Sequence, residues 1–91
     1  MSLREFRAAR GITLRMLIVR KVKDIVLQKE GTLGARLMVY TEYANQIRRA
    51  IEAGEEDLIP DIKDYYKATG LREDVMDEIE EAVRKLLAKR T

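Results

Sequence analysis

The side chains with the most easily named chemistry are the basic ones in the first third of the chain. Residues 1–30 carry eight Arg or Lys and three Asp or Glu. Guanidinium and ammonium groups bind phosphate oxygens and displace counterions, so this segment predicts contact with the backbone of DNA or RNA. The side chains assigned to this contact are Arg7, Arg10, Arg15, Arg20, Lys21 and Lys23.

An acidic stretch later in the chain offers a different partner for the same bases. Residues 55–82 contain eleven acids and three bases, and the formal net charge of the whole chain is only +2. Blocks of opposite sign attract, so the basic third also suits contact with this acidic stretch, in the same chain or in a neighbouring one. Both interpretations remain open from the sequence.

Readout of a nucleic-acid sequence is not expected from this chain. The connection over residues 31–34 is short enough for a helix-turn-helix, but the predicted helix 33–53, whose start overlaps this connection, begins with Leu33, Gly34 and Ala35. A recognition helix presents polar side chains to base edges in its first turns. An ordinary helical hairpin is therefore favoured, and any binding to nucleic acid should show little sequence preference.

Most familiar catalytic groups are missing from the composition. The chain contains no Cys and no His, which excludes disulfides, the usual zinc sites, thiol nucleophiles and imidazole bases. Asp57, Asp61 and Asp64 repeat at helical spacing but lack the central Gly of a calcium loop, so they favour a solvated helix face over a metal site. We therefore expect a non-enzymatic protein with no metal, cofactor or small-molecule substrate.

Glycines and one proline divide the chain into helical segments. Apolar residues repeat with helical period between Gly11, Gly31, Gly54, Pro60 and Gly70. This pattern predicts an all-α fold, a small antiparallel bundle of four to five helices in a single domain over residues 1–91. The predicted helices span 2–10, 14–30, 33–53, 60–68 and 71–89.

The apolar stripe of each long helix predicts which residues form the core. In segment 33–53 the stripe includes Leu37, Tyr40 and Ile47, so the Tyr40 ring is expected in the core. Tyr43 lies beside this stripe and is the tyrosine of the segment expected to be exposed. Stripes of this length require helical partners of similar length.

Segment 14–30 is apolar on two sides. One stripe contains Ile18 and Val22, and a second stripe runs along positions 16, 20, 23 and 27 with apolar ends and a basic middle. A core this small rarely surrounds a helix, so Met16 and Leu27 are predicted to lie in the interface of a homodimer or larger oligomer. The alternative function is thus a structural or adaptor module that docks itself or another helical protein through this segment.

Localisation is expected to be cytoplasmic. The longest apolar runs, 16–19 and 37–40, have four residues each, whereas a helix that spans a bilayer needs about 20. No membrane partner and no signal peptide are therefore expected. The abundance of Arg, Lys, Glu and Ile is typical of a thermophile.

Overall fold

The computed structural model describes the backbone of residues 3–89 and the side chains of residues 14–89. Within this range the chain forms four α-helices and one 3₁₀ turn, and no strand. The predicted all-α bundle is therefore confirmed. The elements are α1 (Leu3–Glu30), α2 (Arg36–Glu52), the 3₁₀ turn η1 (Glu56–Leu58), α3 (Ile59–Ala68) and α4 (Glu73–Ala88).

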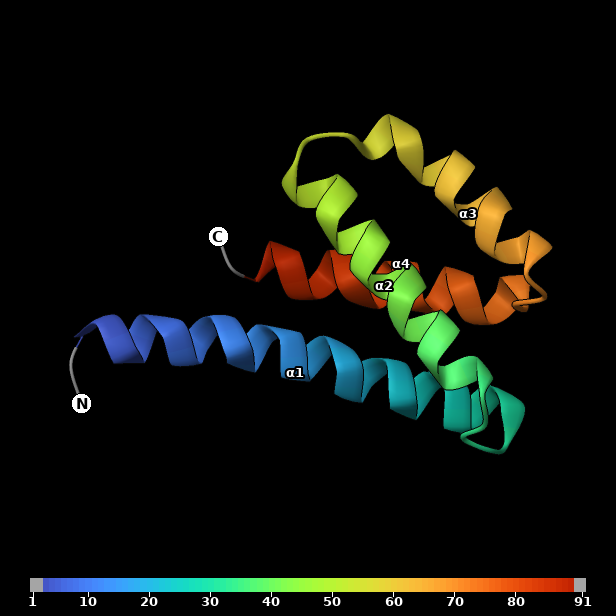
Figure 1. Cartoon of the computed structure of the whole chain (residues 1–91), viewed down its shortest axis with the longest axis horizontal. Coiled ribbons are helices and arrows are strands. Elements are labelled where there is room, and N and C mark those ends of the chain that lie inside the picture. Colours follow the sequence, from blue (N-terminus) through green and yellow to red (C-terminus); the bar gives the residue numbers. More distant parts are fainter. Residues whose placement is uncertain (1–2, 90–91) are drawn as a thin grey trace.

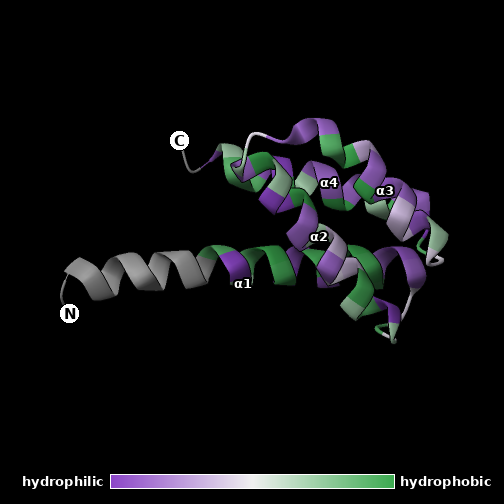
Figure 2. Ribbon diagram, turned by 45° about the horizontal axis from the view of Figure 1, so that its top comes forward, coloured by the Kyte–Doolittle hydropathy of each residue, from purple (hydrophilic) through white to green (hydrophobic). Residues whose placement is uncertain are grey.

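Helix α2 is the element that joins the other three. It packs on α1, α3 and α4, while α1 and α4 pack on each other. Figure 1 shows α1 and α4 running in opposite directions, with α2 crossing them obliquely and α3 on the side of α2 away from α1. Figure 2 shows hydrophobic residues alternating with hydrophilic ones along the helices, as expected for elements with one buried face.

The core lies where α1, α2 and α4 meet. Its members on α1 include Ile18, Val22 and Val26, and those on α4 include Val75 and Ile79, all at most 2% exposed. The predicted stripes thus supply the centre of the core. Sequence reasoning missed two further core residues of α4, Met76 and Leu87, because α4 packs against both α1 and α2 and buries a wider face than one stripe.

The predicted break at Gly11 is wrong. Gly11 does not end a helix, because α1 is continuous from Leu3 to Glu30. One interior glycine costs a helix only about 1 kcal/mol relative to alanine, which is too little to end it. Gly31 does end the helix: its φ is +76°, and its N–H donates to the Leu27 carbonyl at 2.9 Å.

Two expectations for segment 33–53 are also corrected. The helix begins at Arg36 rather than Leu33. Its N-cap is Ala35, whose methyl side chain cannot accept a capping hydrogen bond. Tyr43 is fully buried, with its ring edge-on to Tyr66 at a centroid distance of 5.6 Å. The physical reason is that α3 and α4 both pack on α2, so its buried face extends beyond the stripe that holds Tyr40.

Candidate interaction surfaces on α1 and α3

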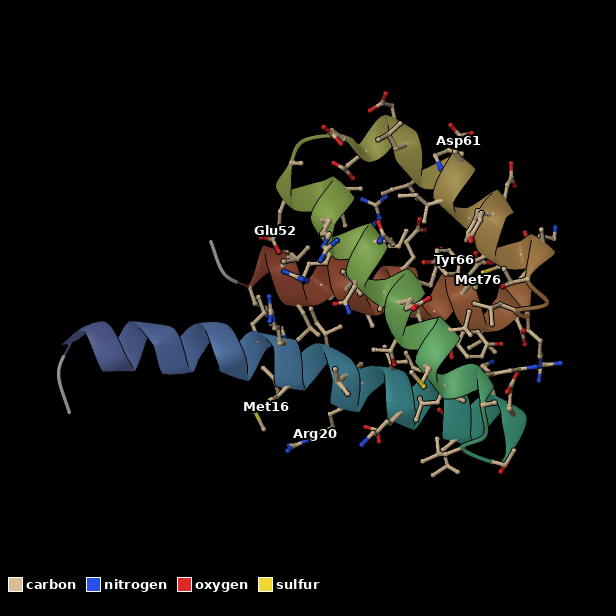
Figure 3. The ribbon with its side chains drawn as sticks, in the orientation of Figure 1. Met16, Arg20, Glu52, Asp61, Tyr66 and Met76 are labelled. Carbon is tan, nitrogen blue, oxygen red and sulfur yellow. The ribbon has the colours of Figure 1, made fainter. Side chains whose placement is uncertain are left out.

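The side of α1 turned away from the core carries the predicted second stripe. Met16 is 56% exposed and Leu27 is 50% exposed, and Arg20 and Lys23 between them are exposed as well. Figure 3 shows the Met16 and Arg20 side chains pointing away from α2 and α4. We call these four residues the α1 outer face, a strip that is apolar at both ends and basic in the middle.

The basic side chains predicted to bind nucleic acid do not gather on one side. Arg15, Arg20, Lys21 and Lys23 are all exposed, but at 100° per residue Arg15 and Lys21 point about 120° apart. Lys21 lines a groove between α1 and α4 together with Glu78 and Glu81. Of the described basic residues, only Arg20 and Lys23 share the α1 outer face.

Two of the predicted binding residues, Arg7 and Arg10, lie outside the range whose side chains the structure describes. Their placement therefore adds nothing to the geometry of this surface, and they stay predictions.

Several acids on α4 and η1 pair with bases elsewhere in the same chain. Glu78 approaches Lys29 at 3.9 Å, and Glu73 approaches Lys67 at 3.1 Å. Asp77 pairs with Lys63 and Glu56 pairs with Arg84. Within the part of the chain that the structure describes, none of the ion pairs includes Arg15, Arg20, Lys21 or Lys23. The α1 outer face is thus not an ion-pair partner of the acidic stretch within one molecule.

A second surface lies between α2 and α3. Leu58 is 42% exposed and Tyr65 is 66% exposed, and the Tyr65 ring rests edge-on against Tyr66 at 5.0 Å between centroids. These side chains border an open groove of about 390 Å³, which we call the α3 groove. Its lining residues are Gln46, Leu58, Asp61, Ile62, Tyr65 and Tyr66.

The surroundings of the α3 groove are acidic. Asp61 lines it, and Asp57 and Asp64 lie exposed on the same helical segment. Among the residues that the structure describes, no cation pairs with these three carboxylates. Burial, and then the negative charge of Glu42 on α2, raise the pKa of Tyr66.

A polar junction closes the end of the bundle where α1, α2 and α4 meet. The Tyr40 hydroxyl donates to Glu30 Oε1 at 2.9 Å and accepts the Arg72 backbone N–H at 3.0 Å. Arg72 Nη1 donates to the Lys29 carbonyl at 2.9 Å, and Arg36 Nη1 donates to Glu30 Oε1 at 3.2 Å. Sequence reasoning missed this junction because its members come from three segments of the chain.

This junction borders an open pocket of about 520 Å³ lined in part by Arg36 and Arg72. Glu30 shares the lining, and its carboxylate already accepts bonds from Arg36 and Tyr40. Arg72 is likewise held by Asp74 through two bonds, at 3.1 Å and 2.7 Å. The charged groups of the junction therefore bind one another, which suits a structural role.

No family model, curated protein or solved structure matches this chain. Across the described range, acidic side chains form no cluster of three that could hold a metal ion. Over the same residues, no helix combines the length and the apolar character that crossing a bilayer requires.

Proposed function

We propose that this protein is a non-enzymatic docking module that assembles through the α1 outer face. The observation that carries the proposal is the exposure of Met16 and Leu27, at 56% and 50%, on the side of α1 opposite to the buried Ile18 and Val22. Large side chains exposed on one helix side gain free energy when a partner covers them, at about 25 cal/mol for each Å² of apolar area buried.

The charge on this face sets the character of the partner. Arg20 and Lys23 lie between the two apolar residues and have no ion-pair partner in the described part of the chain. A partner that covers the strip must therefore offer apolar contact at its ends and carboxylates at its centre. Unmatched charges in an interface cost several kcal/mol, so the basic middle selects an acidic helical surface.

The test compares molar mass by light scattering for the wild type and for Met16→Glu/Leu27→Glu. The wild type should associate at tens of micromolar, where weak contacts become visible, and the variant should be a folded monomer. The matched control is Leu33→Glu/Met38→Glu, which changes two exposed apolar residues that are not part of α1 and should associate like the wild type. A wild type that stays monomeric contradicts the proposal.

Binding to nucleic-acid backbones is the second candidate. It is favoured by the exposure of Arg20 and Lys23 without ion-pair partners among the described residues. It is weakened by the divergence of Arg15 and Lys21, because one duplex would not reach all four side chains.

A salt titration tests this second candidate directly. Duplex and single-stranded DNA are titrated at two salt concentrations with the wild type and with Arg20→Glu/Lys23→Glu. Each lost phosphate contact lowers the slope of log affinity against log salt by about 0.9 for duplex DNA. Negligible binding by both proteins at low salt rejects it.

A further inference from the structure

We propose that the α1 outer face of one molecule docks into the α3 groove of a second copy of this chain. This inference rests on the proposed docking function and names the partner surface. It joins the strip of Met16, Arg20, Lys23 and Leu27 to a groove bordered by Leu58 and Tyr65. The contact is heterologous, because each molecule contributes a different surface to it.

The two surfaces match in apolar character. The α1 outer face ends in Met16 and Leu27, each at least half exposed, while Leu58 and Tyr65 leave 42% and 66% of their area exposed around a groove of about 390 Å³. The unbranched methionine side chain is flexible enough to fill an irregular apolar groove. Docking therefore removes exposed apolar area from both molecules.

The two surfaces also match in charge. Arg20 and Lys23 lie between the apolar ends of the α1 outer face. Asp61 lines the α3 groove, Asp57 and Asp64 lie on the same segment, and none of these acids has an ion-pair partner in the described range. The unpaired bases of one surface thus find the unpaired acids of the other, which steers the encounter and fixes its register.

A symmetric contact between two α1 outer faces lacks this match. The strip is centred between Arg20 and Lys23. A two-fold axis at this point would place Met16 of one copy opposite Leu27 of the other, and would bring Arg20 and Lys23 of both copies together at the middle. Like charges placed against one another cost several kcal/mol. Asp24, an acid exposed on the adjoining side of α1, offsets one positive charge per chain. The acidic groove is therefore the better partner.

The position of the surfaces makes the contact intermolecular. Figure 3 places Met16 and Arg20 on the side of α1 that faces away from the other helices, and Asp61 on α3 at the opposite side of the molecule. One molecule consequently cannot fill its own groove. Heterologous contacts close into rings or continue as open chains, so the assembly should be either a ring of fixed size or a chain that grows with concentration.

A complementation experiment separates this arrangement from all symmetric ones. The strip variant is Met16→Glu/Leu27→Glu, and the groove variant is Leu58→Lys/Tyr65→Lys, which changes exposed residues only. Alone, each should lose association by about tenfold or more and run as a monomer. Mixed in equal amounts, they should form a dimer of one strip variant and one groove variant, because each supplies the surface that the other lacks. Circular dichroism and thermal unfolding confirm that both variants are folded.

The outcomes distinguish the inference from the function on which it rests. A groove variant that associates like the wild type, beside a monomeric strip variant, overturns the groove as partner and leaves docking through α1 standing. Two monomeric variants that fail to combine also overturn the inference. A wild type that is monomeric throughout overturns both proposals.

A charge-reversal pair gives an independent measurement. Arg20→Glu/Lys23→Glu should associate at least about tenfold more weakly than the wild type. Mixed with Asp61→Lys/Asp64→Lys, whose side chains lie on α3, it should recover association in the mixture only. If each variant loses association and the mixture does not regain it, the proposed contact between these charges is contradicted.

Discussion

The hydroxyl of Tyr40 donates a hydrogen bond to Glu30 Oε1 at 2.9 Å and so ties the first turns of α2 to the last residue of α1. The same oxygen accepts the backbone N–H of Arg72, just before α4, at 3.0 Å. The Tyr40 ring is fully buried, and both bonds of its hydroxyl are partly buried at the edge of the core. One hydroxyl thus fixes the three helices of the core relative to one another.

Tyr40→Phe should lower the free energy of unfolding by about 1–2 kcal/mol. The variant keeps the ring in the core but removes the hydroxyl. The Arg72 N–H then loses its acceptor, and Glu30 Oε1 loses one of its donors. Urea unfolding followed by circular dichroism measures the change. An unchanged midpoint would show that water replaces the hydroxyl at no cost.

Tyr43→Phe should leave the free energy of unfolding unchanged or raise it slightly. The Tyr43 hydroxyl is buried and, among the residues that the structure describes, has no hydrogen-bond partner. Removing an unsatisfied buried polar group is neutral or stabilising, by up to about 1 kcal/mol, because its desolvation no longer opposes folding. The same urea titration applies, with Tyr40→Phe as the matched comparison. A clear loss of stability would place an internal water on this hydroxyl.

Stability should fall at alkaline pH. Burial is the largest cause of the raised pKa of Tyr43, and burial also raises the pKa values of Tyr40 and Tyr66. A tyrosine whose pKa is higher in the folded than in the unfolded state holds its proton more tightly when folded. The resulting stabilisation is present below the unfolded pKa of about 10 and is lost as pH rises through the folded value.

Urea midpoints measured from neutral pH to above about pH 10 should therefore decrease, and the decrease should be smaller in Tyr43→Phe. Lys63 acts in the same direction, since its bond to Asp77 is the main cause of its raised pKa. Tyr65→Phe, at an exposed ring, is the matched control. An alkaline loss as large in Tyr43→Phe as in the wild type would assign the effect to other groups.

Helical period was sufficient to predict the fold, because apolar stripes record which face each helix buries. Ile18, Val22 and Ile47 lie in the core as their spacing predicts. The period does not record how many neighbours a helix has. A single stripe therefore predicts an exposed Tyr43. In the structure Tyr43 is buried, because α2 contacts three helices rather than one.

The candidate surfaces were predictable only in part. The position of Met16 and Leu27 opposite to Ile18 follows from 100° per residue, and their exposure agrees with it. The α3 groove did not follow from the sequence, because Gln46 comes from α2 while Leu58 and Tyr65 come from the segment after it. Such a surface depends on how two helices pack, which local spacing does not encode.

Gly31→Ala should destabilise the protein by about 1 kcal/mol, whereas Gly34→Ala should not. Gly31 adopts a φ of +76°, and a Cβ added there meets nothing within 4 Å, so the cost is that of the left-handed backbone alone. Gly34 lies in the same connection with no positive φ and equally open space. Alanine there restricts the unfolded chain and should be neutral or stabilising by up to about 1 kcal/mol.

Thermal and urea unfolding of the two glycine variants, measured side by side, provide the readout. The pair shares a loop, a substitution and an open environment, so a difference between the variants isolates the backbone conformation at the end of α1. Equal effects of the two substitutions would mean that residue 31 leaves the left-handed region without cost and that the path from Glu30 to Arg36 is not fixed by this glycine.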